Sequence, residues 1–220
     1  MVFSESEEIE VNPVFNAIFA KIGENVNDIF ADNNNRKFYK SLLAGGVAMA
    51  NAVVARCQEV KRVCGDIDEA KAMTLTRLFT LFMLSQTFRW LNQASEEGEA
   101  IQVNLSAVSC VLNLFDDNCE KSVEDFLNLD AQFKYELKHH DHITHLAVFL
   151  LAKTCEACGH KCIEWSKVSL PIKSLEPLTS SRAIVDSTAI NSVNDIRAML
   201  SCHTIGIRAM INYHEEHAET

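Results

Sequence analysis

The sequence predicts an all-α protein, a single-domain helical bundle of six to eight mostly antiparallel helices, four of them long. Apolar side chains recur at helical spacing through most of the chain, and no segment alternates apolar and polar residues between hairpin turns. Only 3 prolines and 7 glycines occur in 220 residues, so helices can run long with few interruptions. This length suits one hydrophobic core, and we expect residues 1–220 to form one domain.

The N-terminal half carries start and stop signals for four helices. Asn12 followed by Pro13 is typical of an N-cap and the first helical position. Gly65 can end the second helix, and Asp66 or Asp68 can cap the third. Small residues crowd the middle of the second helix, which favours close approach of a neighbouring helix. The expected helices run from Pro13 to Ile29, from Arg36 to Cys64, through Leu75 to Leu91, and from about Leu105 to Phe115.

The C-terminal half is expected to be built around one long helix that ends before Gly159. Two prolines mark a linker after it, because proline restricts both itself and the residue before it. The expected segments outside the first four helices are a disordered acidic tail over residues 1–12, a long helix from Val123 or Ala131 to Cys158, a linker over residues 168–178, and a last helical region from Thr179 or Ser180 to about Tyr213, broken near Asn194 and Asp195.

The charge balance argues against two classes of partner. The chain has 20 basic and 30 acidic side chains, a net charge of −10, and no basic tail or block, so we expect no binding to nucleic acid. Its longest uncharged apolar stretches reach about a dozen residues, too short to span a bilayer, and its N-terminus lacks the features of a signal peptide. We therefore expect a cytoplasmic protein with no membrane contact, whose 8 cysteines are buried thiols or metal ligands.

The segment from Tyr135 to Trp165 concentrates the side chains that bind metals. Five of the eight histidines and three of the eight cysteines lie in it. Its first half contains Glu136 and His139 in the Glu-x-x-His spacing of di-iron helical proteins, with His142 one turn further on. Such a site needs a second Glu-x-x-His and further glutamates, which the chain does not supply in that form. A ferritin-like or oxygenase-like iron site is one hypothesis, and a solvated polar helix face is the other.

The second half of the segment reads Cys155-x-x-Cys158-Gly-His160-x-Cys162. Two thiolates two residues apart, followed by a glycine, can grip zinc as half of a zinc ribbon does. His160 or Cys162 could complete the ligand set, or Cys202 and His203 could be borrowed for it. The competing interpretation places the cysteines on one core stripe of a helix, because free cysteine behaves as a small buried apolar residue.

A third candidate consists of Asp116, Asp117 and Glu120. Their spacing resembles the acidic motif by which helical prenyl-diphosphate enzymes hold magnesium and phosphate. Those enzymes need a second acidic motif facing the first, and the chain has only a fragment of one at Asn194 and Asp195. A solvated acidic turn is the alternative interpretation.

These observations lead to three functional hypotheses. Because each catalytic constellation lacks a required partner, the leading one is a non-catalytic helical binding or assembly module with a protein partner or self-association, such as a homodimer. The second is a metal-binding helical protein, with structural zinc at the cysteines or iron near Glu136 and His139. The third is a magnesium-dependent phosphate or diphosphate enzyme that uses the acidic motif at residues 116–120.

Overall fold

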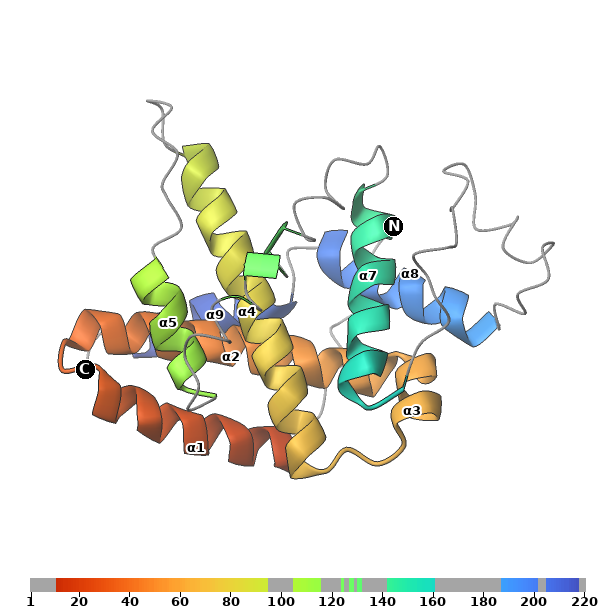
Figure 1. The fold of residues 1–220 in the computed structure, drawn as a ribbon, viewed down its shortest axis with the longest axis horizontal. Coiled ribbons are helices and arrows are strands. Elements are labelled where there is room, and N and C mark those ends of the chain that lie inside the picture. Colours follow the sequence, from red (N-terminus) through yellow and green to blue (C-terminus); the bar gives the residue numbers. More distant parts are fainter. Residues whose placement is uncertain are drawn as a thin grey trace.

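The all-α fold is confirmed by a computed structural model, which describes residues 11–94, 105–115, 124, 127–128, 130–131, 142–160, 187–201 and 205–217 (Figure 1). These residues contain eight helices and no strand. The helices are α1 (Pro13–Ile29), α2 (Asn33–Arg56), α3 (Gln58–Cys64), α4 (Glu69–Ala94), α5 (Leu105–Asn113), α7 (His142–Ala157), α8 (Ser187–Ser201) and α9 (Ile205–Glu216).

Local capping signals placed several helix ends correctly. The side chain of Asn12 accepts a hydrogen bond from the Val14 amide at 3.0 Å, with Pro13 as the first helical residue. Asp68 does the same at the start of α4, where its Oδ1 accepts from the Lys71 amide at 2.8 Å. Each of these ends is fixed by residues adjacent in sequence, so the predicted starts are confirmed.

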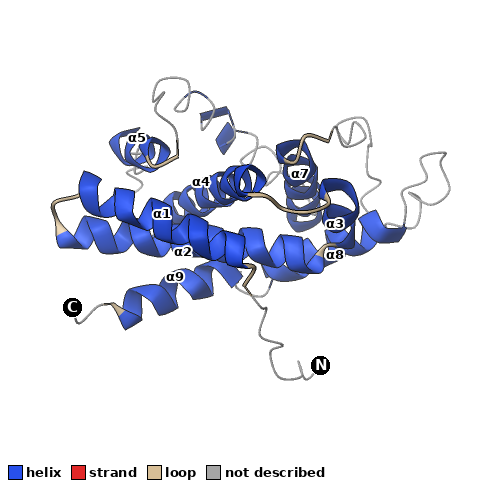
Figure 2. Ribbon diagram, turned by 90° about the horizontal axis from the view of Figure 1, so that it is seen from below, coloured by secondary structure: helices blue, strands red, loops and turns tan. Residues whose placement is uncertain are grey.

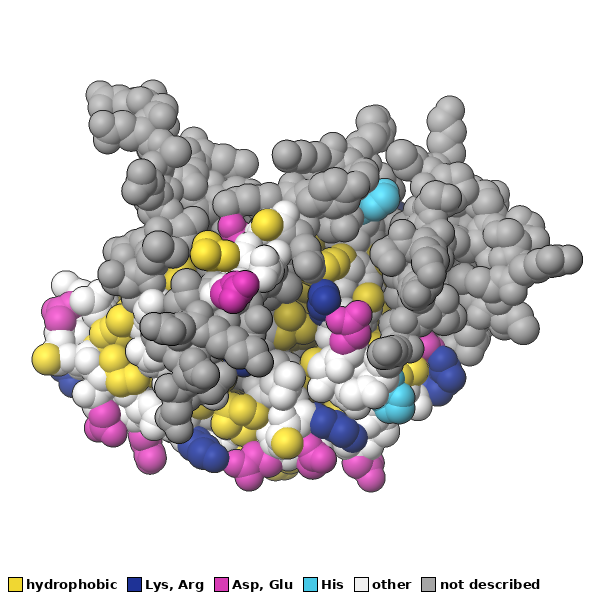
Figure 3. All heavy atoms as spheres, in the orientation of Figure 1, with side chains coloured by type: hydrophobic (Ala, Val, Ile, Leu, Met, Phe, Trp, Pro, Cys, Tyr) yellow, Lys and Arg dark blue, Asp and Glu magenta, His cyan; other side chains and the backbone are white. Residues whose placement is uncertain are grey.

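The apolar helix α2 lies at the centre of the fold. It packs against α1 and α4 on one side and against α9 on the other, as Figure 2 shows from below. By length and composition α2 could cross a membrane, but 72% of its apolar window is buried inside the protein, as expected for the core helix of a bundle. On the face in Figure 3, acidic and basic side chains intermingle along the lower rim of the described residues.

Three glycines allow the close packing around α2. A Cβ added to Gly46 would lie 2.8 Å from both the Cα and the amide nitrogen of Thr80 on α4. A Cβ on Gly45 would lie 2.7 Å from the carbonyl oxygen of Gly206 on α9, and one on Gly206 would lie 2.8 Å from that of Gly45. The small-residue stretch predicted to accept one close neighbour therefore accepts two, one on each side.

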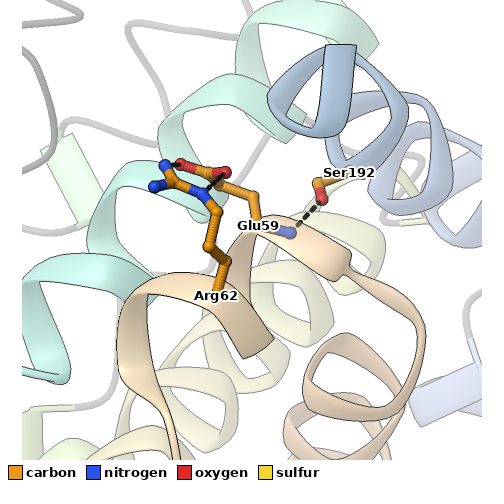
Figure 4. A network of polar contacts seen from close by, with 3 residues as sticks. All are labelled: Glu59, Arg62 and Ser192. Atoms are coloured by element: carbon orange, nitrogen blue, oxygen red, sulfur yellow. Dashed lines mark hydrogen bonds and ion pairs between the residues drawn. The ribbon is translucent and has the colours of Figure 1, made fainter. Parts of the chain in front are cut away.

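The expected single helix from Arg36 to Cys64 is wrong, because the chain breaks at Cys57. This residue is extended, with φ −82° and ψ 105°, and it separates α2 from α3. No side chain of its own segment caps α3. Instead, the Ser192 hydroxyl on α8 accepts a hydrogen bond from the Glu59 amide at 3.0 Å. The Glu59 side chain also forms an ion pair with Arg62, as Figure 4 shows. A partner distant in sequence thus stabilises the break.

Ser192 acts as an N-cap supplied by another helix, so the Ser192→Ala substitution should lower the free energy of unfolding by about 1 kcal/mol. Removal of the hydroxyl leaves the buried Glu59 amide without its acceptor. Chemical denaturation should be compared with that of Thr74→Ala, which removes an exposed hydroxyl bonded only to its own helix. We expect the control to change stability by less than about 0.5 kcal/mol. Equal effects of both substitutions would contradict the capping role.

The predicted break near Asn194 and Asp195 is also wrong. Helix α8 continues through both residues, because Val193, Ile196 and Met199 anchor it with a buried face. Helix α8 ends at Ser201, and α9 begins at Ile205. The acidic tail through residue 10, the 168–178 linker and residues 132–141 of the long helix lie outside the described residues, and α7 is described from His142 onward.

Candidate functional site

Three cysteines from two helices meet between α3 and α7. Cys64 is the last residue of α3, Cys155 lies in the last turn of α7, and Cys158 follows that helix directly. Cys155 and Cys158 lie near enough to Cys64 to lower the pKa of its thiol through side-chain hydrogen bonding. The three side chains, which we call the thiol cluster, are 3%, 0% and 7% exposed for Cys64, Cys155 and Cys158 respectively. The helices that carry them lie side by side in Figures 1 and 2.

The end of α7 is closed by a Schellman motif that shapes one side of the cluster. Gly159 has φ +82°, a conformation that favours glycine. The His160 amide bonds to the Cys155 carbonyl at 3.0 Å, and the Gly159 amide bonds to that of Glu156 at 2.9 Å. The chain therefore reverses at the cluster and leaves His160 exposed beside it, close enough for its charge to act on Cys64.

A glycine also follows the end of α3. Gly65 follows Cys64 with φ +59°, as the sequence predicts for a helix stop. The ammonium group of Lys71 donates to the carbonyl oxygens of Cys64 at 2.8 Å and Asp66 at 2.9 Å. The C-terminal ends of two helices thus converge on the thiol cluster, and both carry the partial negative charge that favours a nearby cation.

Within the cluster, the pKa of Cys64 is lowered and the pKa of Cys158 is raised. Hydrogen bonds from the thiols of Cys155 and then Cys158 hold the pKa of Cys64 well below its ordinary value, with help from His160 and Lys71. The same contact with Cys64, together with burial, raises the pKa of Cys158. The cluster therefore gives up a first proton readily and a second one with difficulty, because the second charge would form beside the first.

This arrangement suits two kinds of chemistry, the binding of a soft metal ion and the formation of a disulfide. Within the described residues, no group of three or more histidine, cysteine or acidic side chains could hold a metal ion as it stands. The thiol cluster is instead a set of hydrogen-bonded thiols. A metal would have to replace the shared protons and draw the sulfurs around itself, with a fourth ligand added.

The structure brings together only part of the predicted site. Cys155 and Cys158 meet in the thiol cluster, and His160 lies beside it. Both cysteines are also buried in the core, as the core interpretation expects, and Cys155 lies on α7 with Val148 and Leu151, whereas Cys158 follows the end of that helix. The predicted residues outside the described part are Cys162 of the cysteine motif, Glu136 and His139 of the iron hypothesis, and Asp116, Asp117 and Glu120 of the magnesium hypothesis; for His142, only the backbone is described.

Cys64 is the residue that sequence reasoning missed. We expected it to close a long helix and assigned it no chemistry. One signal was present, because Cys64-Gly65 and Cys158-Gly159 are both cysteines followed by a helix-stopping glycine. Two such ends can meet only if their helices end at the same place, and that depends on the fold.

A serine–histidine contact elsewhere is not suited to nucleophilic catalysis. The Ser41 hydroxyl lies 3.5 Å from Nδ1 of His214, at the limit of hydrogen bonding. It donates its proton to the Lys37 carbonyl of its own helix at 2.7 Å. The histidine therefore does not receive the serine proton in this arrangement.

No protein-family model, no curated protein and no solved structure matches this chain.

Proposed function

We propose that this chain is a metal-binding helical protein in which Cys64, Cys155 and Cys158 bind one zinc ion. The fourth ligand is His160 or Cys162, which follow the cluster closely in sequence. The site would be structural and non-catalytic, because buried sulfurs close it on the protein side and structural zinc sites have four protein ligands. The proposal places the protein in the reducing cytoplasm, where thiols stay available to metals.

The observation that carries the proposal is the contact of Cys64 with both cysteines of the Cys-x-x-Cys motif. Zn–S bonds of about 2.3 Å place the sulfurs of a tetrahedral site roughly 3.8 Å apart. The three cysteines do not yet form a set that could hold an ion, so zinc binding would have to draw their sulfurs to this spacing. The two helix ends and the thiolates would both attract the ion, while Lys71 offsets part of the remaining negative charge.

Zinc is favoured over iron or magnesium by the ligand type. Thiolate sulfur selects zinc and similar soft ions, whereas magnesium prefers oxygen ligands. The iron site near Glu136 and His139 and the magnesium site at residues 116–120 stay predictions, since these residues lie outside the described part. Zinc would join α3 to α7, a role that is compatible with a binding or assembly module.

Elemental analysis of the full chain, purified without an affinity tag or chelator, tests the proposal. We expect about one zinc per chain in the wild type and none in Cys64→Ser. The matched control is Cys110→Ser, which changes a half-buried cysteine on α5 and should retain the metal. Comparison of His160→Ala with Cys162→Ser then identifies the fourth ligand.

Two results would overturn the assignment. A wild-type protein without stoichiometric metal, even after incubation with zinc under reducing conditions, would leave the cluster as buried core thiols. A metal that persists in Cys64→Ser but is lost in His139→Ala would move the site to the histidine segment.

A further inference from the structure

We propose that α9 pairs with α9 of a second copy of this chain, antiparallel about a two-fold axis, and so forms a weak homodimer. The surface concerned is the outward face of α9, made of four exposed side chains: Arg208, Ile211, Asn212 and Glu215. The pairing does not depend on the metal, because the thiol cluster lies on α3 and at the end of α7, whereas α9 packs against α2.

Among the described residues, α9 packs through one side. That inward side consists of residues that are buried or partly buried: Gly206, Ala209, Met210 and Tyr213. Successive residues of a helix advance by about 100°, so the inward side and the outward face are centred on opposite sides of α9. Figure 2 shows α9 on the outer side of α2, with no other described helix beyond it. The outward face is therefore open to a partner.

The outward face carries opposite charges at its two ends. Arg208 and Glu215 are seven residues apart, so they lie on the same side of the helix, about 10 Å apart along its axis. Ile211, which is 45% exposed, and Asn212 lie between them. Within the described part of the chain, neither charged side chain takes part in an ion pair or a hydrogen bond.

A two-fold axis makes this face complementary to itself. If the axis passes between Ile211 and Asn212, Arg208 of each copy lies opposite Glu215 of the other, and both pairs attract. A parallel pairing would place like charges opposite each other, so the charges favour the antiparallel one. Since each chain has a net charge of −10, two copies repel overall, and their attraction has to come from a local arrangement of this kind.

The small size of the face predicts a weak, reversible dimer. The 12 residues of α9 extend about 18 Å, less than a standard protein interface provides. Exposed ion pairs add little affinity and are screened by salt, although they fix the orientation of the partners. Burial of Ile211 against the second copy adds an apolar contribution.

Sedimentation equilibrium of the full chain under reducing conditions, which exclude disulfide dimers, tests the proposal. We expect the wild type to dimerise at chain concentrations up to about 1 mM and to dissociate as salt is added. Arg208→Glu and Glu215→Arg should each weaken the dimer about tenfold or more, because each turns both pairs into like charges. The matched control is Arg197→Glu, which makes the same charge change at an exposed position of α8 and should dimerise as the wild type does.

A mixture of the two reversed variants is specific for the antiparallel pairing. Arg208→Glu presents two acidic groups and Glu215→Arg two basic groups, so the mixture should form a heterodimer although each variant alone dimerises poorly. The double variant with both reversals should dimerise as the wild type does. A wild type that stays monomeric at about 1 mM overturns the proposal. So does a dimer that neither reversal weakens, or a mixture that associates no better than its components.

Discussion

The Gly46→Leu substitution is expected to lower the free energy of unfolding by about 3 kcal/mol or more. Even a single Cβ at this position would lie 2.8 Å from the backbone of Thr80, and backbone cannot rotate away as a side-chain tip can. The longer leucine side chain must therefore push α2 and α4 apart. Thermal and urea denaturation of the variant should show a lower midpoint, with loss of soluble protein as the extreme result.

Gly23→Ala is the matched control for this experiment. Gly23 also lies inside a helix, but nothing surrounds the position where its Cβ would be within 4 Å. Alanine should stabilise α1 by about 0.5–1 kcal/mol, since it loses less backbone entropy than glycine on folding. A Gly46→Leu protein that melts with the wild type would show that α2 and α4 are not in backbone contact.

Zinc is expected to give the second large effect, a higher melting temperature of the reduced protein. Free zinc at about 1,000 times its dissociation constant adds about 4 kcal/mol to stability when only the folded state binds it. For a chain of this size, that corresponds to a rise of about 8–16 °C in the midpoint. Differential scanning fluorimetry of the metal-free protein, titrated with zinc and then with a chelator, measures the rise and its reversal.

Cys64→Ser should show almost no such rise, while Cys110→Ser should show the full one. The two variants differ in whether the lost sulfur belongs to the thiol cluster. A full rise in Cys64→Ser would mean that zinc stabilises the protein from somewhere else. Magnesium should not substitute for zinc in the titration, because thiolates bind it poorly.

Much of the fold could be predicted from the sequence where the decisive interactions are local. Asn12 and Asp68 bond to amides two or three residues away, and Gly65 and Gly159 follow helix ends with positive φ values that favour glycine. The helical class follows from apolar spacing, which is also a local property. These features depend on neighbours in the sequence and not on how the helices pack.

The wrong helix boundaries lie where contacts with residues distant in sequence determine whether the helix continues. Nothing near Cys57 signals a break, and the break exists because Ser192 supplies an acceptor from α8. Asn194 and Asp195 resemble a helix break, yet the buried face of α8 holds the helix together through them. Such effects depend on tertiary contacts, which override local preferences.

Only part of the thiol cluster could be predicted from the sequence, for the same reason. Cys155 and Cys158 are linked by sequence spacing and a following glycine, which suggested a metal site directly. Cys64 joins them only because α3 is a separate short helix that ends against α7. If α2 continued to Cys64 as one helix, as expected, this thiol would not lie beside Cys155 and Cys158.

Helix α3 has a consequence that reaches beyond its own packing. At seven residues it is too short to be stable alone. It is stabilised by Ser192 at one end and by Lys71 and the thiol cluster at the other. Coupling between two sites is reciprocal, so a ligand that stabilises one end of α3 also stabilises the contacts at the other end. A displacement of α8 away from α3 would therefore also loosen the thiol cluster, so the short helix would couple the Ser192 contact to the cysteines.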